Sequence, residues 1–126
     1  MTIAYLCVLF AFFLPTLLAG YAKLSAGFRP KDNHAPRSFL AHAEGKALRA
    51  RWAEQNTYEA LPPFFAAVII AHQLHAPQHT VDALAVAFIV LRLIYSWCYI
   101  TDRASLRSLV WMAGVACCAA LVCIGF

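Results

Sequence analysis

Apolar residues gather in four long stretches separated by polar segments, and this pattern predicts an all-α integral membrane protein. The stretches cover residues 3–24, a segment centred on 60–72, residues 83–100 and residues 109–126. A helix needs about 20 residues to cross the roughly 30 Å hydrocarbon core of a bilayer, so four crossings use nearly the whole chain. We therefore expect one domain, 1–126, folded as a four-transmembrane-helix bundle with helices at approximately 3–25, 46–74, 81–101 and 104–126.

The composition supports a membrane protein and argues against a soluble one. Hydrophobic residues make up 63% of the 126 positions and charged residues 13%. A soluble domain averages about 45–50% apolar and about 25% charged residues. The formal net charge of +4 is then explained by membrane topology and contact with anionic lipid, and we expect no nucleic-acid partner.

Cysteine and histidine do not form a recognisable metal or disulfide pattern. All five cysteines fall within apolar stretches and none forms a CxxC pair, so we interpret them as small buried hydrophobes. His75 and His79 have the spacing of a helical metal pair, but Pro77 between them argues against a helix there. We expect no metal.

The basic residues predict the orientation in the membrane. Lys and Arg are concentrated in or beside the first polar connection, and Arg103 and Arg107 flank the third, whereas the second connection, 72–80, has neither residue type. The positive-inside rule then places connections one and three in the cytoplasm and both termini on the opposite side. The N-terminus has no basic segment before its apolar run, so we interpret that run as a retained first helix.

The second and third helices carry polar residues at membrane depth. The purely apolar part of the second helix is too short to cross alone, so the helix must extend back through Asn56 and Glu59. At 1.5 Å per residue, Glu59 and Tyr95 each lie about 10 Å below the cytoplasmic boundary and Arg92 about 15 Å below it. An arginine side chain reaches toward its nearer interface, so we expect Arg92 and Glu59 to face each other. Helical spacing places Tyr99 on the same stripe as Arg92 and Tyr95.

The two prolines that follow this acid are expected to shape the site. Pro62 and Pro63 lack the N–H groups that would bond the carbonyls of Tyr58 and Glu59, so we expect a kink beside the acid. Two interpretations of the polar stripes remain open. They are either a satisfied network that holds helices together or a pocket, open to the cytoplasm, for a charged small molecule. The number of arginines near one membrane face favours the pocket.

At these residues the chain resembles the MAPEG family, the membrane-associated proteins in eicosanoid and glutathione metabolism, in its short bacterial form. The second helix carries Arg49-x6-Asn56-x-x-Glu59-x-x-Pro62. The third carries Arg92-x-x-Tyr95-x-x-x-Tyr99, and Arg103-x-x-x-Arg107-Ser108 leads into the fourth. The resemblance covers nearly the whole chain, because length, spans and the order of the motifs all agree.

The resemblance implies a homotrimer in a bacterial inner membrane that binds glutathione between neighbouring subunits near the cytoplasmic side. It also implies two groups of site residues, one for binding glutathione and one for activating its thiol. The binding group is Arg49, Arg51, Asn56, Glu59, Arg92 and Tyr95, and the candidate catalytic group is Tyr99, Arg107 and Ser108. Glutathione carries two carboxylates and one ammonium, which arginines and one acid complement.

The leading hypothesis is therefore an enzyme, a glutathione-dependent transferase or peroxidase that uses glutathione as co-substrate. Its second substrate would be a hydrophobic electrophile or a lipid hydroperoxide that arrives from the bilayer. One alternative is a non-catalytic, lipid-binding MAPEG relative. Another is a small proton-coupled multidrug exporter, which the sequence favours less because the first helix has no charge before Lys23 and a cationic substrate would be repelled by Arg92.

Overall fold

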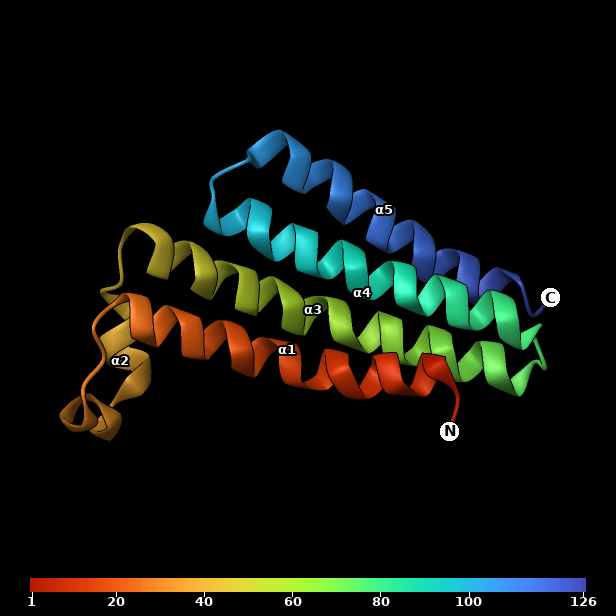
Figure 1. Ribbon diagram of the computed structural model, residues 1–126, viewed down its shortest axis with the longest axis horizontal. Helices are drawn as coiled ribbons and strands as arrows, with labels where there is room; N and C mark the ends of the chain where they lie inside the picture. The colour runs from red at the N-terminus through yellow and green to blue at the C-terminus, as the bar shows by residue number, and fades with distance from the viewer.

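The protein is all-helical. The computed structural model describes residues 1–126 and contains five α-helices and one short 3-10 helix (Figure 1). In chain order these are α1 (Ile3–Ser25), η1 (Pro30–His34), α2 (Pro36–Ala41), α3 (Gly45–Gln73), α4 (Gln78–Ile100) and α5 (Ala104–Cys123).

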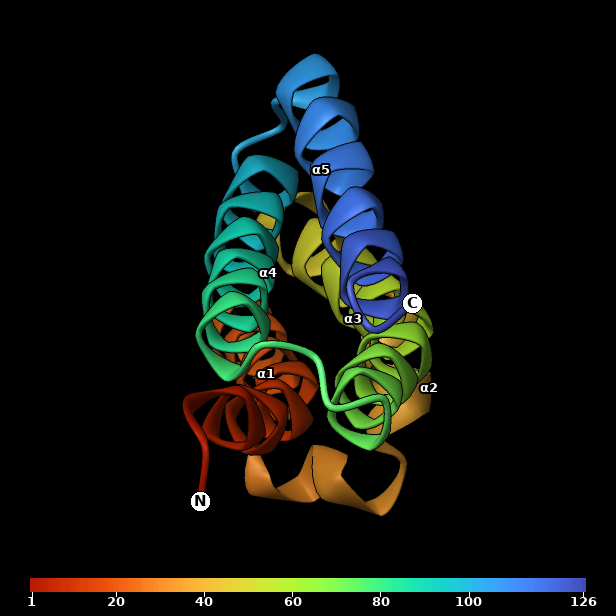
Figure 2. The same cartoon turned by 90° about the vertical axis from the view of Figure 1, so that its right-hand side faces the viewer.

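The four long helices lie side by side and alternate in direction (Figure 1). The α1–α3 and α4–α5 connections lie at one end, and the two termini and the α3–α4 turn lie at the other. We call the first of these the basic end, because Lys23, the arginines of the first connection, Arg103 and Arg107 are there. Viewed along the bundle, α5 packs mainly on α4 and lies on the far side from α1 (Figure 2).

Three of the long helices, α1, α4 and α5, are long and apolar enough to cross a membrane. Large apolar side chains point outward from them, among them Phe12 and Leu17 on α1 and Leu109 and Met112 on α5. A soluble protein rarely exposes so much contiguous apolar surface, whereas a bilayer solvates it. The chain is therefore an integral membrane protein. Helix α3 is the least apolar of the four, because its first half carries charged residues.

The connection between α1 and α3 is more ordered than the sequence pattern indicated. We expected no helix there, but residues 30–41 form η1 and α2, each with a proline at its start. Proline fits the first turn of a helix because its fixed φ is already helical and its missing N–H would have had no partner. Helix α3 continues without interruption through Pro62 and Pro63, as α1 does through Pro15.

Three of the long helices end in the same hydrogen-bonded turn. After α1, α3 and α4, one residue takes a positive φ: Gly27 at 73°, His75 at 55° and Asp102 at 59°. At each turn the next N–H bonds back five residues, as Arg103 N does to Cys98 O at 2.8 Å. This Schellman arrangement satisfies carbonyls that a helix end leaves free.

The largest apolar core lies in the half of the bundle away from the basic end. Its centre is the stacked pair Phe64 and Phe88, whose ring centroids are 4.0 Å apart and whose planes differ by 8°. Alanines such as Ala67 and Ala85 are fully buried around the pair, and small residues of this kind let membrane helices approach closely. This packed half holds α3 and α4 together and leaves their polar residues toward the basic end.

Candidate functional site

Arg92 is buried inside the bundle and bonds to two residues of α3. Its side chain is 4% exposed. Nη1 and Nη2 each donate to Oδ1 of Asn56 at 3.2 Å, and Nη2 also donates to Oγ1 of Thr57 at 3.0 Å. Thr57 is 0% exposed, and its own hydroxyl donates to the carbonyl of Ala53 at 2.7 Å. The arginine therefore joins α4 to α3 through neutral acceptors.

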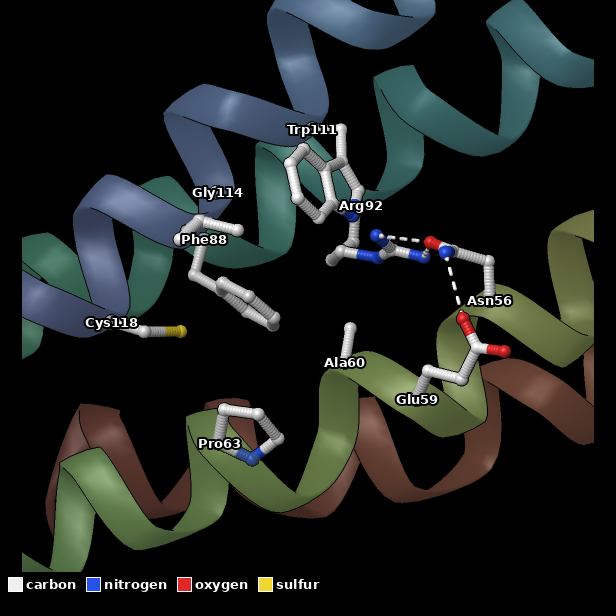
Figure 3. A pocket seen from close by; sticks show the side chains of 10 residues that line it. Asn56, Glu59, Ala60, Pro63, Phe88, Arg92, Trp111, Gly114 and Cys118 are labelled. Carbon is white, nitrogen blue, oxygen red and sulfur yellow. Dashed lines mark hydrogen bonds between the residues drawn. The ribbon is translucent and has the colours of Figure 1, made fainter.

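Glu59 does not bond Arg92 directly, which corrects the expected pairing. Instead, Nδ2 of Asn56 donates to Oε2 of Glu59 at 3.1 Å, so the Asn56 amide stands between the acid and the base (Figure 3). Asn56 can bridge the two groups because an amide accepts on one side and donates on the other, whereas arginine only donates and a carboxylate only accepts. Glu59 lies on the exposed surface of α3 and stays accessible.

The hydrogen bonds of Arg92 are incomplete. A guanidinium has five N–H donors. Arg92 makes three hydrogen bonds to α3, and all three come from Nη1 and Nη2. Nε is buried and has no acceptor in the protein. Leaving a buried donor without a partner costs about 1–3 kcal/mol, and more when it is charged. The hydrogen bonds to α3 therefore leave one donor of the Arg92 guanidinium unsatisfied.

A series of stacked cations and rings leads from Arg92 to the basic end. The Arg92 guanidinium lies over the ring of Tyr95 at 4.2 Å, and that ring meets Tyr99 edge-on with centroids 5.7 Å apart. Arg107 of α5 lies over the ring of Tyr99 at 4.3 Å. The hydrogen bonds around Arg92 and Asn56 use neither phenol hydroxyl. The two phenol rings therefore lie in a row between the Arg92 and Arg107 guanidinium groups.

The other residues singled out from the sequence are placed differently. Nε of Arg49 donates to the carbonyl of Ile100 at 3.0 Å, so this arginine holds the end of α4. Ser108 is exposed, and its hydroxyl donates back to the carbonyl of Ala104 at 3.2 Å. Arg51 is half-buried on α3 and takes no part in the hydrogen bonds of Arg92. The structure thus gathers Asn56, Glu59, Arg92 and Tyr95, with Tyr99 and Arg107 adjoining.

A cavity of about 220 Å³ opens beside this group, between α3, α4 and α5. Asn56, Glu59 and Arg92 form its polar end. The remaining wall is mostly apolar and consists of Ala60, Pro63, Phe88, Trp111, Gly114, Val115 and Cys118. Figure 3 shows the two ends, with Phe88, Gly114 and Cys118 on the side away from Asn56 and Glu59. The site therefore joins a charged compartment to an apolar one.

The sequence prediction missed the apolar wall and Thr57. Trp111, Gly114 and Cys118 lie in a stretch of α5 that is apolar all round, so the sequence contains no signal for the face that meets the cavity. Thr57 adjoins Asn56 but carries no charge, and a mid-helix threonine more often bonds only to its own helix. The structure contains no group of three or more His, Cys, Asp or Glu side chains that could hold a metal.

Taken together, the fold and site define a helical integral membrane protein with an amphipathic pocket among its helices. Comparison with protein families identifies which one: the model of the MAPEG family matches residues 2–126, essentially the whole chain. The chain therefore belongs to the MAPEG family, which is a family of membrane proteins related to glutathione-dependent transferases and peroxidases. Searches among curated proteins and among solved structures found no significant match.

Proposed function

We propose that this protein is a glutathione-dependent transferase or peroxidase that acts on hydrophobic electrophiles or lipid hydroperoxides. Family membership supports the general class. The observation that carries the proposal further is the buried Arg92, bonded through Asn56 to Glu59 and stacked on Tyr95, with one donor still unpaired. This group borders an amphipathic cavity, as a reaction between a charged thiol and an apolar partner requires.

The charges of the site complement those of glutathione. Arg92 supplies a guanidinium group for a glutathione carboxylate, because planar guanidinium matches carboxylate geometry. Glu59 is exposed and uses one oxygen for Asn56, so its carboxylate can still accept from the glutathione ammonium. The rings of Tyr95 and Tyr99 are stacked against the Arg92 and Arg107 guanidinium groups. We assign glutathione binding to this group rather than to Arg49, which bonds to α4.

Tyr99 and Arg107 are the proposed thiol-activating pair. A thiolate is the nucleophile, and a nearby cation or phenol donor lowers the pKa of the glutathione thiol by stabilising its anion. In transfer, the sulfur bonds to the electrophilic carbon and displaces the leaving group, while the thiol proton goes to water. In peroxide reduction, the sulfur takes the terminal oxygen and the alcohol leaves. A second glutathione then reduces the sulfenic acid to water and the disulfide.

The assembly and orientation belong to the same proposal. Helix α3 lies alongside α1 and α4 and runs antiparallel to both, and we propose that it crosses the membrane with them as a fourth span. We propose that three subunits associate and that the basic end faces the cytoplasm of a bacterial inner membrane, where glutathione is available. The mass of the purified complex, measured by light scattering with the detergent contribution subtracted, tests the trimer.

Two arginines at the basic end make a matched test of activation. Arg103 lies over Trp97 at 4.8 Å much as Arg107 lies over Tyr99, but it lies outside the site. We expect wild type in detergent to bind glutathione in calorimetry and to produce a thiolate absorbance band. Arg107→Gln should lose the band and at least about tenfold in kcat, the scale of one electrostatic contact, while Arg103→Gln keeps both. Equal behaviour of the two variants would remove Arg107 from the mechanism.

The calorimetric titration also separates the leading function from its alternatives. Glutathione binding that Arg92→Leu abolishes in a correctly assembled protein supports the pocket assignment. Normal glutathione binding without any thiolate band or turnover would favour the non-catalytic, lipid-binding relative. Absence of glutathione binding together with proton-driven uptake of a cationic dye into proteoliposomes would favour the exporter, although no contact in the structure points to it.

A further inference from the structure

The connection between α1 and α3, residues 26–44, lies at the end of α1 and projects beyond that helix on the side away from α5 (Figures 1 and 2). Helix α1 is long and apolar enough to span a membrane. A segment that projects sideways from the end of a spanning helix lies at the level of the lipid headgroups. The connection therefore lies over the bilayer surface beside the bundle.

The connection is fixed to the bundle by packing. Leu40 of α2 is buried and clusters with Ala22 of α1 and Ala50 of α3. The neighbouring Phe39 meets Phe28 edge-on, with ring centroids 5.1 Å apart. A surface held in this way is preorganised, so a ligand that binds to it pays little to order the backbone.

The exposed side of the connection is basic. Arg29, Lys31 and Arg37 are exposed, and Arg37 lies on the face of α2 opposite the buried Leu40. Of the nearby acids, Asp32 already accepts a hydrogen bond from the backbone N–H of Arg29, at 2.8 Å. The side-chain hydrogen bonds within the connection use none of the three cationic groups. Lysine and arginine at a membrane surface attract anionic headgroups, and guanidinium matches phosphate geometry.

An apolar stripe on the outer face of α1 leads to these charges. Phe13, Leu17 and Leu24 are all exposed, and Leu24, in the last turn before the connection, is 84% exposed. Their spacing of four and seven residues places them on one side of the helix. The stripe and the basic surface correspond to the two parts of a phospholipid, its acyl chains and its phosphate. A water-soluble anion would use only the second.

We propose that the connection and the outer face of α1 together bind one anionic phospholipid of the phosphatidylglycerol type. Arg29, Lys31 and Arg37 hold its phosphate, and an acyl chain lies along Leu17 and Leu24. The site is separate from the cavity between α3, α4 and α5. The inference uses only the membrane character of the chain and does not depend on the proposed glutathione-dependent function.

A photochemical crosslink locates the lipid. p-Benzoylphenylalanine replaces Leu17 on α1 in one variant and Leu109 on α5 in another, because both leucines are exposed and apolar. Each full-length variant is placed in bilayers of equal parts phosphatidylglycerol and phosphatidylcholine with identical acyl chains. On irradiation the ketone takes a hydrogen atom from a nearby C–H bond and the two carbon radicals join. Mass spectrometry then identifies the attached lipid.

We expect phosphatidylglycerol to exceed phosphatidylcholine at least about fivefold among the crosslinks at position 17, and to match it within about twofold at position 109. Lys31→Gln combined with Arg37→Gln should lower the excess at position 17 to about the ratio at position 109. Arg103→Gln combined with Arg107→Gln is the matched control. It removes the same charge from the basic end, but on the α5 side, and should leave the excess at position 17 unchanged.

Three results would overturn the site. Equal phosphatidylglycerol excess at positions 17 and 109 would mean that the whole basic end attracts anionic lipid diffusely. Crosslinks from position 17 to a second copy of the chain, in place of lipid, would mean that another subunit covers the stripe. An unchanged excess in the folded Lys31 and Arg37 double variant would remove the connection from headgroup binding. None of these measurements involves glutathione, so failure of the proposed function would leave this inference standing.

Discussion

Asn56 holds the site together because its amide accepts from a donor on one side and donates to an acceptor on the other. Its Oδ1 accepts from Arg92 and its Nδ2 donates to Glu59. An aspartate at this position would keep the first contact and lose the second, and a leucine would lose both. The amide therefore fixes the positions of the two charged groups that we assign to glutathione.

Thr57 gives the sharpest stability prediction at this scale. Thr57→Val keeps the shape of the side chain but removes the acceptor of a buried charged donor, so we expect about 1–2 kcal/mol of destabilisation. Thr101→Val is the matched control, because Thr101 makes the same bond to its own helix, at 2.8 Å to the carbonyl of Trp97, but is exposed. Thermal unfolding in detergent, followed by circular dichroism, measures both. Equal losses would mean that Arg92 does not depend on Thr57.

Helical periodicity predicted part of this site and could not predict the rest. Arg92, Asn56 and Glu59 stand out because charge and amide groups are rare in hydrocarbon, and spacing places them on facing stripes. Spacing does not tell which acceptor an arginine reaches, so the expectation that Arg92 faces Glu59 did not show that Asn56 stands between them. Gly114 carries no sequence signal, because its place in the cavity wall depends on how α5 packs against α3 and α4.

At the scale of elements, Arg49 connects two helices at the basic end. Its bond to the carbonyl of Ile100 satisfies one of the last carbonyls of α4, one residue beyond Tyr99. Arg49→Leu should therefore loosen the end of α4, with faster hydrogen exchange over residues 98–103 and a loss of about 1–2 kcal/mol. Arg51→Leu, on another face of α3, is the control. Unchanged exchange in the Arg49 variant would mean that the turn is held by its own backbone bonds.

The end of α1 tests the contribution of backbone conformation alone. Gly27 has φ 73°, and a Cβ added there would have no atom within 4 Å. Gly27→Ala should therefore cost about 1–2 kcal/mol through the left-handed backbone and not through a clash. The reciprocal change, Asp102→Gly at φ 59°, should raise the unfolding temperature, because it relieves the same cost after α4. If both variants unfold as wild type does, these turns carry no such strain.

At the scale of the whole molecule, the balance of apolar and polar stretches determines the architecture. Its helical membrane character could be predicted, because a run of about 20 apolar residues has few other stable conformations. The short helices η1 and α2 could not, since their order depends on contacts such as the edge-on pair of Phe28 and Phe39. The cavity could not be predicted either, because it depends on how α5 sits against α3 and α4.

The orientation of the bundle gives the last prediction. Lys31 in η1 and His79 at the start of α4 are both exposed and lie at opposite ends. With Cys123→Ser as background to remove the exposed native thiol, His79→Cys should react with a membrane-impermeant maleimide on intact inner membranes. Lys31→Cys should react only after lysis if the basic end faces the cytoplasm, as proposed from its lysines and arginines. Labelling of Lys31→Cys before lysis and of His79→Cys only after lysis would place the basic end outside the cytoplasm. That result would contradict the proposed orientation.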